Sequence, residues 1–340
     1  MPGGDRNKKP QEEEEEEVKT SFAHIPYDLT EHCLAITPRR HYPNLSLASK
    51  SFRRILRSPE LYQRRSTLGV TKPVLYASIG FPSSETPSWH TLHRDHVSFR
   101  LRKIASLPSR LLSAVATVGT EMHVLGGSVG GNPTSDVNLI DCRFHTSRSL
   151  PSMKRTRSRA VAGAIDGKLG AICQLSCHIF VLDPSATCLV FDPSVGALVE
   201  WDDGGELMSL WQASSCMVDD KPNKLYTIDT GRSLKYPIVV YDPKAKVKRW
   251  KPVYGVNLRR DLLPFSSYYD SKMANLGGKL LILIGNNPWP IFHYGRQDVW
   301  CVEIALERHG DETFGRVEST MLVLTSQKWP SIELSRTLTI

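Results

Sequence analysis

A short phrase recurs four times along this chain: a tight turn, a charged residue and an apolar run. Its first apolar residues are Met122, Leu169, Leu225 and Leu280, which follow one another at intervals of 47, 56 and 55 residues. Repeats of this length are typical of propeller blades, each of which is a small antiparallel sheet. The recurrence therefore predicts a mainly β chain folded as a propeller rather than as a sandwich.

A second phrase follows three of these starts, an apolar strand that ends in an aspartate. The aspartates are Asp141, Asp192 and Asp242, and the last two are each followed by a proline. Farther on come Trp201 and Trp250, which we place at the end of a fourth strand. The pattern predicts a third strand that ends in a turn, and a tryptophan that packs between neighbouring blades.

An irregularity near the middle of the repeats affects the number of blades. Residues 165–174 have the pattern of the opening half of one blade, and residues 177–201 that of the closing half of another. The early strands, within residues 74–104, form a further blade that lacks a first strand, and we expect residues 321–325 to supply it. Such pairing would close the ring and remove exposed edges. We predict five blades, with six as the alternative.

The segment before the repeats, residues 21–67, has helical spacing instead. Asp28 is placed to cap a first helix, with a glutamate three residues on, and Pro38 ends that helix. Pro43 begins a second helix, and Ser58 with the proline after it begins a third. A unit this small cannot bury all of its apolar residues by itself, so part of its apolar surface should be covered by a partner.

The order of residues in this helical segment resembles the F-box. In the order of that family's pattern, this chain has an Ile-Pro opening, an Asp-Leu pair, a proline-ended helix, a Ser-Lys-x-Phe block and a Ser-Pro close. Ile25, Ala48 and Phe52 stand where the family has Leu, Val and Trp, and all three remain apolar. The resemblance implies docking on a Skp-family adaptor and, through it, on a cullin. By motif position, the residues for that contact or for the small core behind it are Ile25, Pro26, Leu29, Leu34, Ile36, Pro38, Leu45, Phe52 and Leu56.

The repeats resemble the kelch motif, although only the one with Gly126-Gly127 is close to the family pattern. Taken together, residues 21–326 resemble plant F-box/kelch-repeat proteins. That resemblance implies that the propeller holds a target protein, which we expect on the longer connections, residues 127–135 and 286–297. Aromatic residues anchor interfaces, although in propellers they also pack between blades. The candidate target-binding residues are Trp289, Phe292, His293 and Tyr294.

Two terminal segments complete the predicted organisation. Residues 1–20 contain six consecutive glutamates, which repel one another and predict a disordered, solvated acidic tail. The helical F-box domain is predicted at residues 21–67, the propeller at 71–326 and a C-terminal tail at 327–340.

Composition and motifs exclude several kinds of partner. The formal charge of +8 allows an acidic partner but does not name one. The arginines of the helical segment lack interleaved aromatic residues and a helix-turn-helix glycine, so we expect no nucleic-acid partner. No signal peptide or membrane span is present, which predicts a soluble protein of the cytoplasm, the nucleus or both, without a membrane partner.

The same reasoning argues against metal, cofactor and catalytic chemistry. Seven cysteines without an export signal predict free thiols, and the cluster of Cys173, Cys177 and His178 lacks further metal ligands at finger-like spacing. Some kelch propellers are copper oxidases, but the histidines here are scattered along the chain and no phosphate-loop or zinc-protease motif occurs. We therefore predict a non-catalytic substrate receptor of a Skp-cullin-F-box ubiquitin ligase. The alternative is a kelch interaction scaffold without ligase function.

Overall fold

The structure is a computed structural model that describes most of the chain from Ile25 onward. The described residues are 25–81, 86–94, 98–105, 107–158, 162–165, 168–170, 173–175, 178–182, 188–192, 197–200, 215–218, 224–229, 236–242, 245–247, 249–256, 271–285 and 297–340, with the backbone alone for 163–200, 217 and 297. The chain divides into two compact units between Val70 and Thr71, each described below by itself. None of the described helices is long and apolar enough to cross a membrane.

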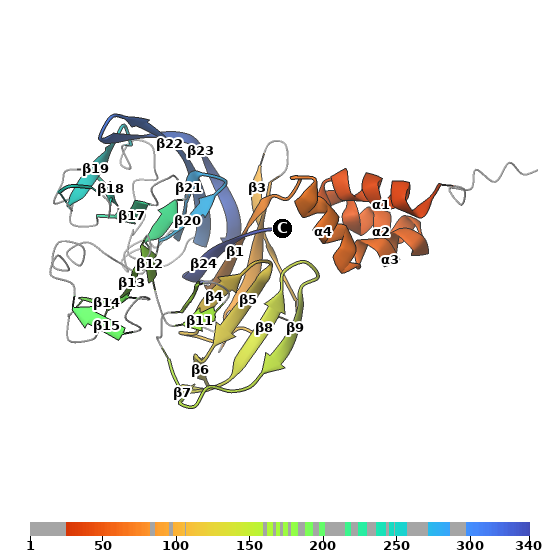
Figure 1. The fold of residues 1–340 in the computed structure, drawn as a ribbon, viewed down its shortest axis with the longest axis horizontal. Coiled ribbons are helices and arrows are strands. Elements are labelled where there is room, and N and C mark those ends of the chain that lie inside the picture. Colours follow the sequence, from red (N-terminus) through yellow and green to blue (C-terminus); the bar gives the residue numbers. More distant parts are fainter. Residues whose placement is uncertain are drawn as a thin grey trace, which may run out of the picture. The chain divides into compact units, whose positions relative to one another are not determined.

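The first unit consists of four short α-helices and a 3-10 turn (Figure 1). These elements are α1 (Tyr27–Ile36), the 3-10 turn (Arg39–His41), α2 (Tyr42–Ala48), α3 (Lys50–Leu56) and α4 (Pro59–Thr67). We predicted three helices, and the predicted second helix is in fact split at Ser49. This residue is extended, with φ −151° and ψ 140°, and its hydroxyl accepts a hydrogen bond from the backbone N–H of Ser51. An N-cap serine inside the apolar pattern thus begins a new helix.

The helix ends follow the predicted prolines but not the predicted first cap. Asp28 lies inside the first turn of α1, where no side chain caps the helix, because the chain is already helical from the residue after Pro26. The glutamate that was to complete the capping box points to α4 instead. Helix α1 does end before Pro38, and the Ser58 hydroxyl accepts from the N–H of Leu61 at 3.4 Å, both as predicted.

Within the described residues, the second unit contains three four-stranded antiparallel sheets and one eight-stranded sheet made of two four-stranded antiparallel groups, besides two two-stranded sheets. The five four-stranded groups are as many as the blades predicted. In spatial order their strands are β24-β1-β2-β3, β4-β5-β8-β9, β12-β13-β14-β15, β16-β17-β18-β19 and β20-β21-β22-β23, the last two being joined by a short parallel pairing of β19 with β23. Their bounds are β1 (Pro73–Gly80), β2 (Ser88–Arg94), β3 (Phe99–Lys103), β4 (Ala114–Val118), β5 (Glu121–Leu125), β8 (Val137–Asp141), β9 (Thr146–Leu150), β12 (Cys173–Leu175), β13 (His178–Leu182), β14 (Cys188–Asp192), β15 (Ala197–Glu200), β16 (Cys216–Val218), β17 (Lys224–Ile228), β18 (Ile238–Tyr241), β19 (Trp250–Tyr254), β20 (Lys272–Leu276), β21 (Lys279–Gly285), β22 (Gln297–His309), β23 (Glu312–Ser326) and β24 (Ser331–Thr339).

The C-terminal strand β24 completes the blade formed by β1, β2 and β3, the first strands of the second unit. We expected residues 321–325 to supply that strand and residues 327–340 to be a tail, and both expectations are wrong. The former lie in β23, which pairs with β22, whereas β24 pairs with β1 from Pro73 opposite Thr339 to Gly80 opposite Ser331. Apolar residues alternate along the last segment, and three of them are buried: Ile332, Leu338 and Ile340.

The irregular middle region contains a two-stranded sheet, β10 (Gly163–Ile165) with β11 (Lys168–Gly170), directly before a complete four-stranded one. Strand β12 (Cys173–Leu175), which we assigned to the opening half of one blade, pairs instead with β13 as the first strand of the next. The break between the two partial repeats therefore falls earlier than predicted, between residues 170 and 173.

The core lies on both faces of the β20–β23 sheet, because a blade is covered by neighbours on each side. Along β21, Leu280 and Ile282 pack with strands β16–β19, whereas Leu281 and Leu283 pack with β1, β3 and β24. A continuous apolar run is what such a strand requires. Trp250 is buried as predicted, but it is the first residue of its strand rather than the last, and its ring lies 5.4 Å from that of Tyr241.

Candidate functional sites

The residues predicted to bind the adaptor divide into an exposed set and a buried set. Ile25, Leu29 and Ile36 are 46%, 57% and 52% exposed, which is unusual for large apolar side chains in so small a unit. Pro26 and Pro38 are also exposed, and Leu45 and Phe52 are partly buried. Leu34 and Leu56 are buried and belong to the core. Only the exposed set is therefore available for the predicted docking contact.

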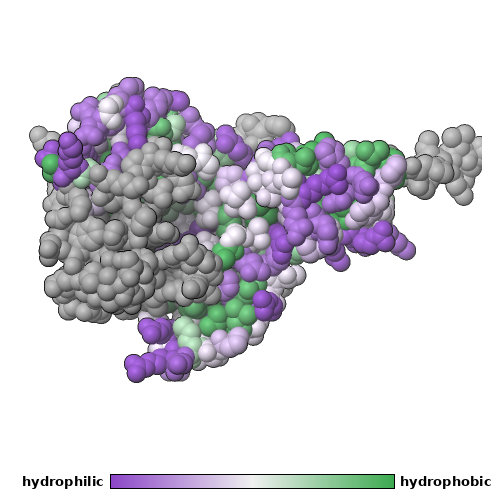
Figure 2. Space-filling model, in the orientation of Figure 1, coloured by the Kyte–Doolittle hydropathy of each residue, from purple (hydrophilic) through white to green (hydrophobic). Residues whose placement is uncertain are grey.

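Helix α1 turns an apolar stripe outward. Leu29, Cys33 and Ile36 lie within an arc of about 60° on the helix, given 3.6 residues per turn. All three are exposed, while the opposite face buries Leu34 and Ala35. Figure 2 shows hydrophobic surface over α1 directly beside hydrophilic surface of the same unit. We call Leu29, Cys33 and Ile36 the α1 stripe.

Two further exposed apolar side chains were missed by the motif comparison. Tyr27 opens α1 and is about half exposed, and Leu47, near the end of α2, is 77% exposed. The helical period alone did not decide whether these two side chains are buried or exposed, since both are apolar residues in short helices that have core positions nearby. They extend the set of candidate docking residues.

Arg65 fixes the end of α1 from beneath the surface. Its buried guanidinium donates hydrogen bonds to the carbonyl oxygens of Ala35, Thr37 and Val70 and to the hydroxyl of Tyr42. The Tyr42 hydroxyl in turn donates to the Leu34 carbonyl oxygen at 3.0 Å, and burial raises the pKa of this phenol, an effect that the nearby Arg65 charge opposes. A cation at the C-terminal end of α1 also interacts favourably with the helix dipole.

A second buried contact joins α1 to α4. The Glu31 carboxylate lies 3.3 Å from Arg64 Nη1, and the glutamate is buried in the unit. Together with Arg65, this pair fixes α1 in the orientation that turns the α1 stripe outward. Sequence reasoning missed both contacts, because it assigned Glu31 to a cap and considered the arginines only as possible nucleic-acid ligands.

The Gly126-Gly127 pair occupies backbone positions that only glycine fits. Their φ angles are +58° and +101°, and a Cβ on Gly126 would lie 2.3 Å from the carbonyl oxygen of Arg157. The buried guanidinium of Arg110 closes the same turn by donating to the carbonyl oxygens of Gly126, Val124 and Asp136. The kelch-like residues therefore define a rigid loop rather than a reactive centre.

The candidate target-binding residues Trp289, Phe292, His293 and Tyr294 lie outside the described residues, so their prediction stays untested. The other predicted recognition connection, residues 127–135, is described. It forms a small hairpin of β6 (Ser128–Val129) with β7 (Asn132–Pro133), in which Val129 is exposed.

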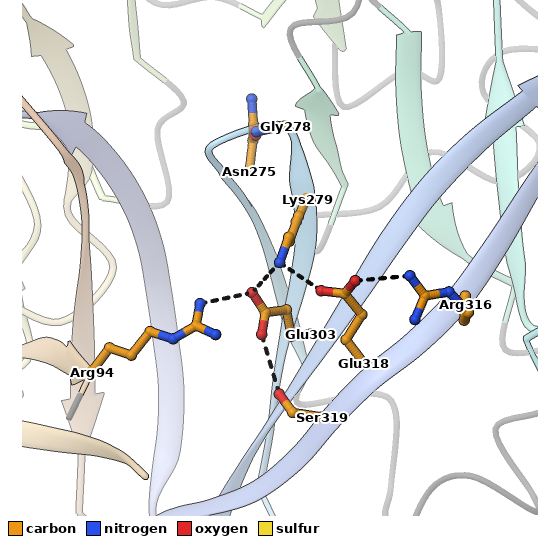
Figure 3. Close-up of polar contacts among 8 residues, drawn as sticks. All are labelled: Arg94, Asn275, Gly278, Lys279, Glu303, Arg316, Glu318 and Ser319. Carbon is orange, nitrogen blue, oxygen red and sulfur yellow. Dashed lines mark hydrogen bonds and ion pairs between the residues drawn. The ribbon is translucent and has the colours of Figure 1, made fainter. Parts of the chain in front are cut away.

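A polar cluster between strands β2, β21, β22 and β23 was not anticipated from the sequence (Figure 3). Glu303, whose side chain is almost fully buried, accepts hydrogen bonds from Arg94 at 3.3 Å, Lys279 at 3.1 Å and Ser319 at 3.3 Å. Lys279 also contacts Glu318. Because Arg94 comes from the first blade and the other residues from the last, the cluster joins neighbouring sheets, and its charges are paired with one another.

The comparisons with known proteins agree with this division of the chain. A model of the F-box domain matches residues 22–64, and a model of the kelch motif matches residues 109–154. An F-box/kelch-repeat protein of Arabidopsis thaliana is 38% identical over an alignment of 391 positions, gaps included, which covers 100% of this chain and 98% of that protein. This chain belongs to the F-box/kelch-repeat protein family.

Other Arabidopsis thaliana relatives of this F-box/kelch-repeat chain are similar to the same degree. A protein described as F-box/LRR-repeat/kelch-repeat is 39% identical over 99% of this chain and 96% of its own length. A kelch repeat-containing protein is 39% identical over 93% of this chain and 86% of its own.

The matched F-box covers α1 to α3 and most of α4, and ends at Arg64, one residue before Arg65. The matched kelch motif spans the blade β4-β5-β8-β9 and contains both Arg110 and the Gly126-Gly127 turn. Among the residues that the structure describes, no three histidine, cysteine, aspartate or glutamate side chains are grouped as a metal site would need. The cluster of Cys173, Cys177 and His178 lies outside the described side chains.

The four described cysteines are free thiols, as predicted, and they are Cys33, Cys142, Cys216 and Cys301. Burial raises the pKa of the Cys216 thiol to about 12 and raises that of Cys301 further still. Neither is a thiolate at neutral pH, so neither has the character of a nucleophile.

Proposed function

We propose that this F-box/kelch-repeat protein is a substrate-recognition subunit of a Skp-cullin-F-box type ubiquitin ligase. In this proposal the F-box binds a Skp-family adaptor, the adaptor binds a cullin, and the kelch propeller binds a target protein. The α1 stripe carries the proposal. A ten-residue helix with an apolar stripe on its outer face is expected to be covered there by a partner, since exposing apolar surface to water has a free-energy cost.

The proposed role requires no chemistry from this chain. A receptor acts by proximity, because holding a target near the charged conjugating enzyme raises the local concentration of its lysines. We therefore propose a non-catalytic subunit that works without a cofactor and acts in the cytoplasm, the nucleus or both. Its partners are proteins, with no role for nucleic acid or membrane.

Target recognition is assigned to the propeller loops on general grounds. Loops on a rigid strand scaffold tolerate variation in length and sequence, which suits binding of diverse partners. The connection with Trp289, Phe292, His293 and Tyr294 is the proposed contact, because its aromatic residues are of the types that anchor interfaces.

The test is binding of a purified Skp-family adaptor to the full-length protein by pull-down and calorimetry. The test variant is the double substitution Leu29→Asp, Ile36→Asp, which places charges on the α1 stripe without touching the core. The matched control is Leu68→Asp, at an exposed leucine outside the predicted docking set. A charge at Leu34 would be uninformative, since this side chain is buried and the variant would test folding instead.

We expect the parent and the control to bind, and the double variant to bind at least about 100-fold more weakly, since desolvating an unpaired charge costs several kcal/mol. Circular dichroism checks that all three proteins fold. A folded parent that does not bind the adaptor would overturn the ligase role and favour an interaction scaffold. Equal binding by the parent and the double variant would overturn the assignment of the α1 stripe.

A further inference from the structure

Helix α3 and the residue that directly follows it carry a ridge of four cations on one side. Lys50, Arg53, Arg54 and Arg57 are all exposed, and at 3.6 residues per turn they lie within an arc of about 100°. The opposite side of the helix faces the core with Ile55 and Leu56. We call the four cations the α3 ridge.

The α3 ridge has no anionic partner within the described part of the chain. Like charges three and four residues apart repel one another on a helix. Asp28, Glu31 and Glu60 are the only acidic residues between positions 25 and 70, against eight Arg and Lys, and Glu31 is already paired with Arg64. The helix dipole favours the cations of the last turn but disfavours a lysine at the first position of the helix. The ridge is therefore a surface that lacks a counter-charge.

One candidate docking residue lies close to the α3 ridge along the chain. The exposed Leu47 precedes Lys50 by only three residues, whereas the partly buried Phe52 projects from the other side of α3, about 150° around the helix from the middle of the ridge. Whatever occupies the ridge near Lys50 is thus placed to influence a partner that covers Leu47.

We propose that the six glutamates of residues 12–17 occupy the α3 ridge when the adaptor is absent, and that they lower the affinity of the F-box for the adaptor. The second half of this proposal rests on the proposed function. Six carboxylates over six residues face four cations, which makes the tract the most complementary segment of the chain. No other run of this chain has more than two consecutive acidic residues.

The tether is long enough for this contact. Seven residues separate the glutamate tract from Ile25, and at about 3.3 Å per residue they span up to about 23 Å. A compact unit of this size is about 24 Å across, or about 38 Å around half of its circumference. The tether and the tract together have 13 residues and span up to about 43 Å, so the tract can extend along the surface to the far side of the helices. A tether this short also gives an effective concentration on the order of millimolar, which supports a contact made of exposed charges.

Zero-length carbodiimide cross-linking of the full-length protein tests the contact itself. Lys50 is the only lysine between residues 25 and 70, so a bond from a tract glutamate to Lys50 reports occupancy of the ridge. The test variant is Arg53→Gln, Arg54→Gln, Arg57→Gln, and the matched control is Arg100→Gln, Arg102→Gln on β3, where both arginines are exposed.

We expect a Lys50 cross-link at 50 mM salt that persists in the β3 control. It should fall at least about fivefold in the α3 variant and at 500 mM salt, where exposed charges are screened. Absence of the cross-link in the parent would overturn the proposal. A yield unchanged by salt and by the α3 substitutions would also overturn it.

Adaptor affinity tests the consequence. Replacing all six glutamates by glutamine should tighten adaptor binding about fivefold at 50 mM salt, whereas replacing them by aspartate keeps the charge and should leave it unchanged. Equal affinity of the glutamine variant and the parent would overturn the competition. A parent that binds no adaptor would fail the proposed function, and the Lys50 cross-link would still decide occupancy. Binding of single-stranded RNA to the ridge with equal affinity in the parent and the glutamine variant would show that the tract does not occupy it.

Discussion

At the scale of single residues, Arg65 shows how much of the F-box geometry depends on one buried side chain. Its guanidinium donates to three backbone carbonyl oxygens and one phenol, which come from α1, α2 and the end of the unit. Each of these acceptors is left without that donor if the arginine is removed, and an unsatisfied buried group costs roughly 1–3 kcal/mol.

We expect Arg65→Met to destabilise the helical unit by about 3 kcal/mol or more. The control Arg54→Gln, at an exposed arginine of the same unit, should change its stability by less than about 0.5 kcal/mol. Hydrogen exchange of the α1 and α4 amides in the full-length protein measures both effects. Equal exchange rates in the two variants would contradict the structural role of Arg65.

The kelch turn provides a second prediction at this scale. Gly126→Ala should destabilise the propeller by about 3 kcal/mol or more, because its Cβ would overlap the Arg157 carbonyl oxygen. Gly119→Ala is the matched control, since Gly119 has nearly the same φ of +56° with no atom within 4 Å of the added Cβ. The control should cost only the backbone strain of about 1 kcal/mol. Urea unfolding followed by tryptophan fluorescence compares the two variants. Equal losses in the free energy of unfolding would show that backbone strain, rather than overlap with the Arg157 carbonyl oxygen, causes the destabilisation.

At the scale of elements, strand β24 holds the two ends of the second unit together. Its pairing with β1 covers an edge that would otherwise be open. Leu338→Ala should cost about 3 kcal/mol, as is typical for a buried leucine, whereas Leu322→Ala in β23, at a largely exposed leucine, should cost less than about 1 kcal/mol. Urea midpoints measure the difference. Similar costs would mean that β24 contributes little to the blade.

The polar cluster predicts a pH dependence for the β21–β23 sheet. The hydrogen bond from Lys279 lowers the pKa of Glu318 below its usual 4.5, and hydrogen bonds first to Glu318 and then to Glu303 raise the pKa of Lys279 above its usual 10.5. The lowered pKa of Glu318 means that its contribution is present above pH 4.5 and is lost as the pH falls through the folded value. The raised pKa of Lys279 means that its contribution is present below pH 10.5 and is lost as the pH rises through the folded value.

A double-mutant cycle with Lys279→Gln and Glu318→Gln isolates this pair. We expect a coupling free energy of up to about 1 kcal/mol at pH 7, given the exposure of both side chains, and a smaller value below pH 4.5. Denaturant unfolding at several pH values measures it. A coupling that stays constant from pH 7 to pH 4 would contradict the assignment.

At the scale of the whole molecule, the chain divides between Val70 and Thr71 into a helical unit and a β unit. If the adaptor binds only the helical unit, it should stabilise only the helical unit. At 100 times its dissociation constant we expect the adaptor to add about 2.7 kcal/mol to the protection of the α1–α4 amides. Amides of β4, β5 and β8 should be unchanged in the same hydrogen-exchange experiment. Equal protection of both units would show that the propeller takes part in adaptor binding.

The division into helices and blades was predictable from local patterns. The glycine pair and Pro38 act on the backbone of adjacent residues, and the blades repeat one short local pattern at a regular interval. Each of these signals can therefore be recognised in the sequence alone. The predictions that failed within the helical unit concern helix boundaries, where two neighbouring residues could each begin a helix. Asp28 would cap a helix that begins at Leu29, but α1 begins two residues earlier, at Tyr27. Ser49 divides a helix that the apolar pattern alone predicts to be continuous.

The sequence by itself determined the family, the mainly β class, the small helical F-box and the list of apolar residues from which a docking surface is drawn. Only the tertiary structure decided that Leu29 is exposed while Leu34 is buried, that β24 rather than residues 321–325 completes the first blade, and that Glu303 pairs with Arg94. The physical reason is that burial and pairing depend on partners far apart in the chain. Arg94 and Glu303 are separated by 209 positions, and no local pattern of residues specifies which distant side chain fills a given space.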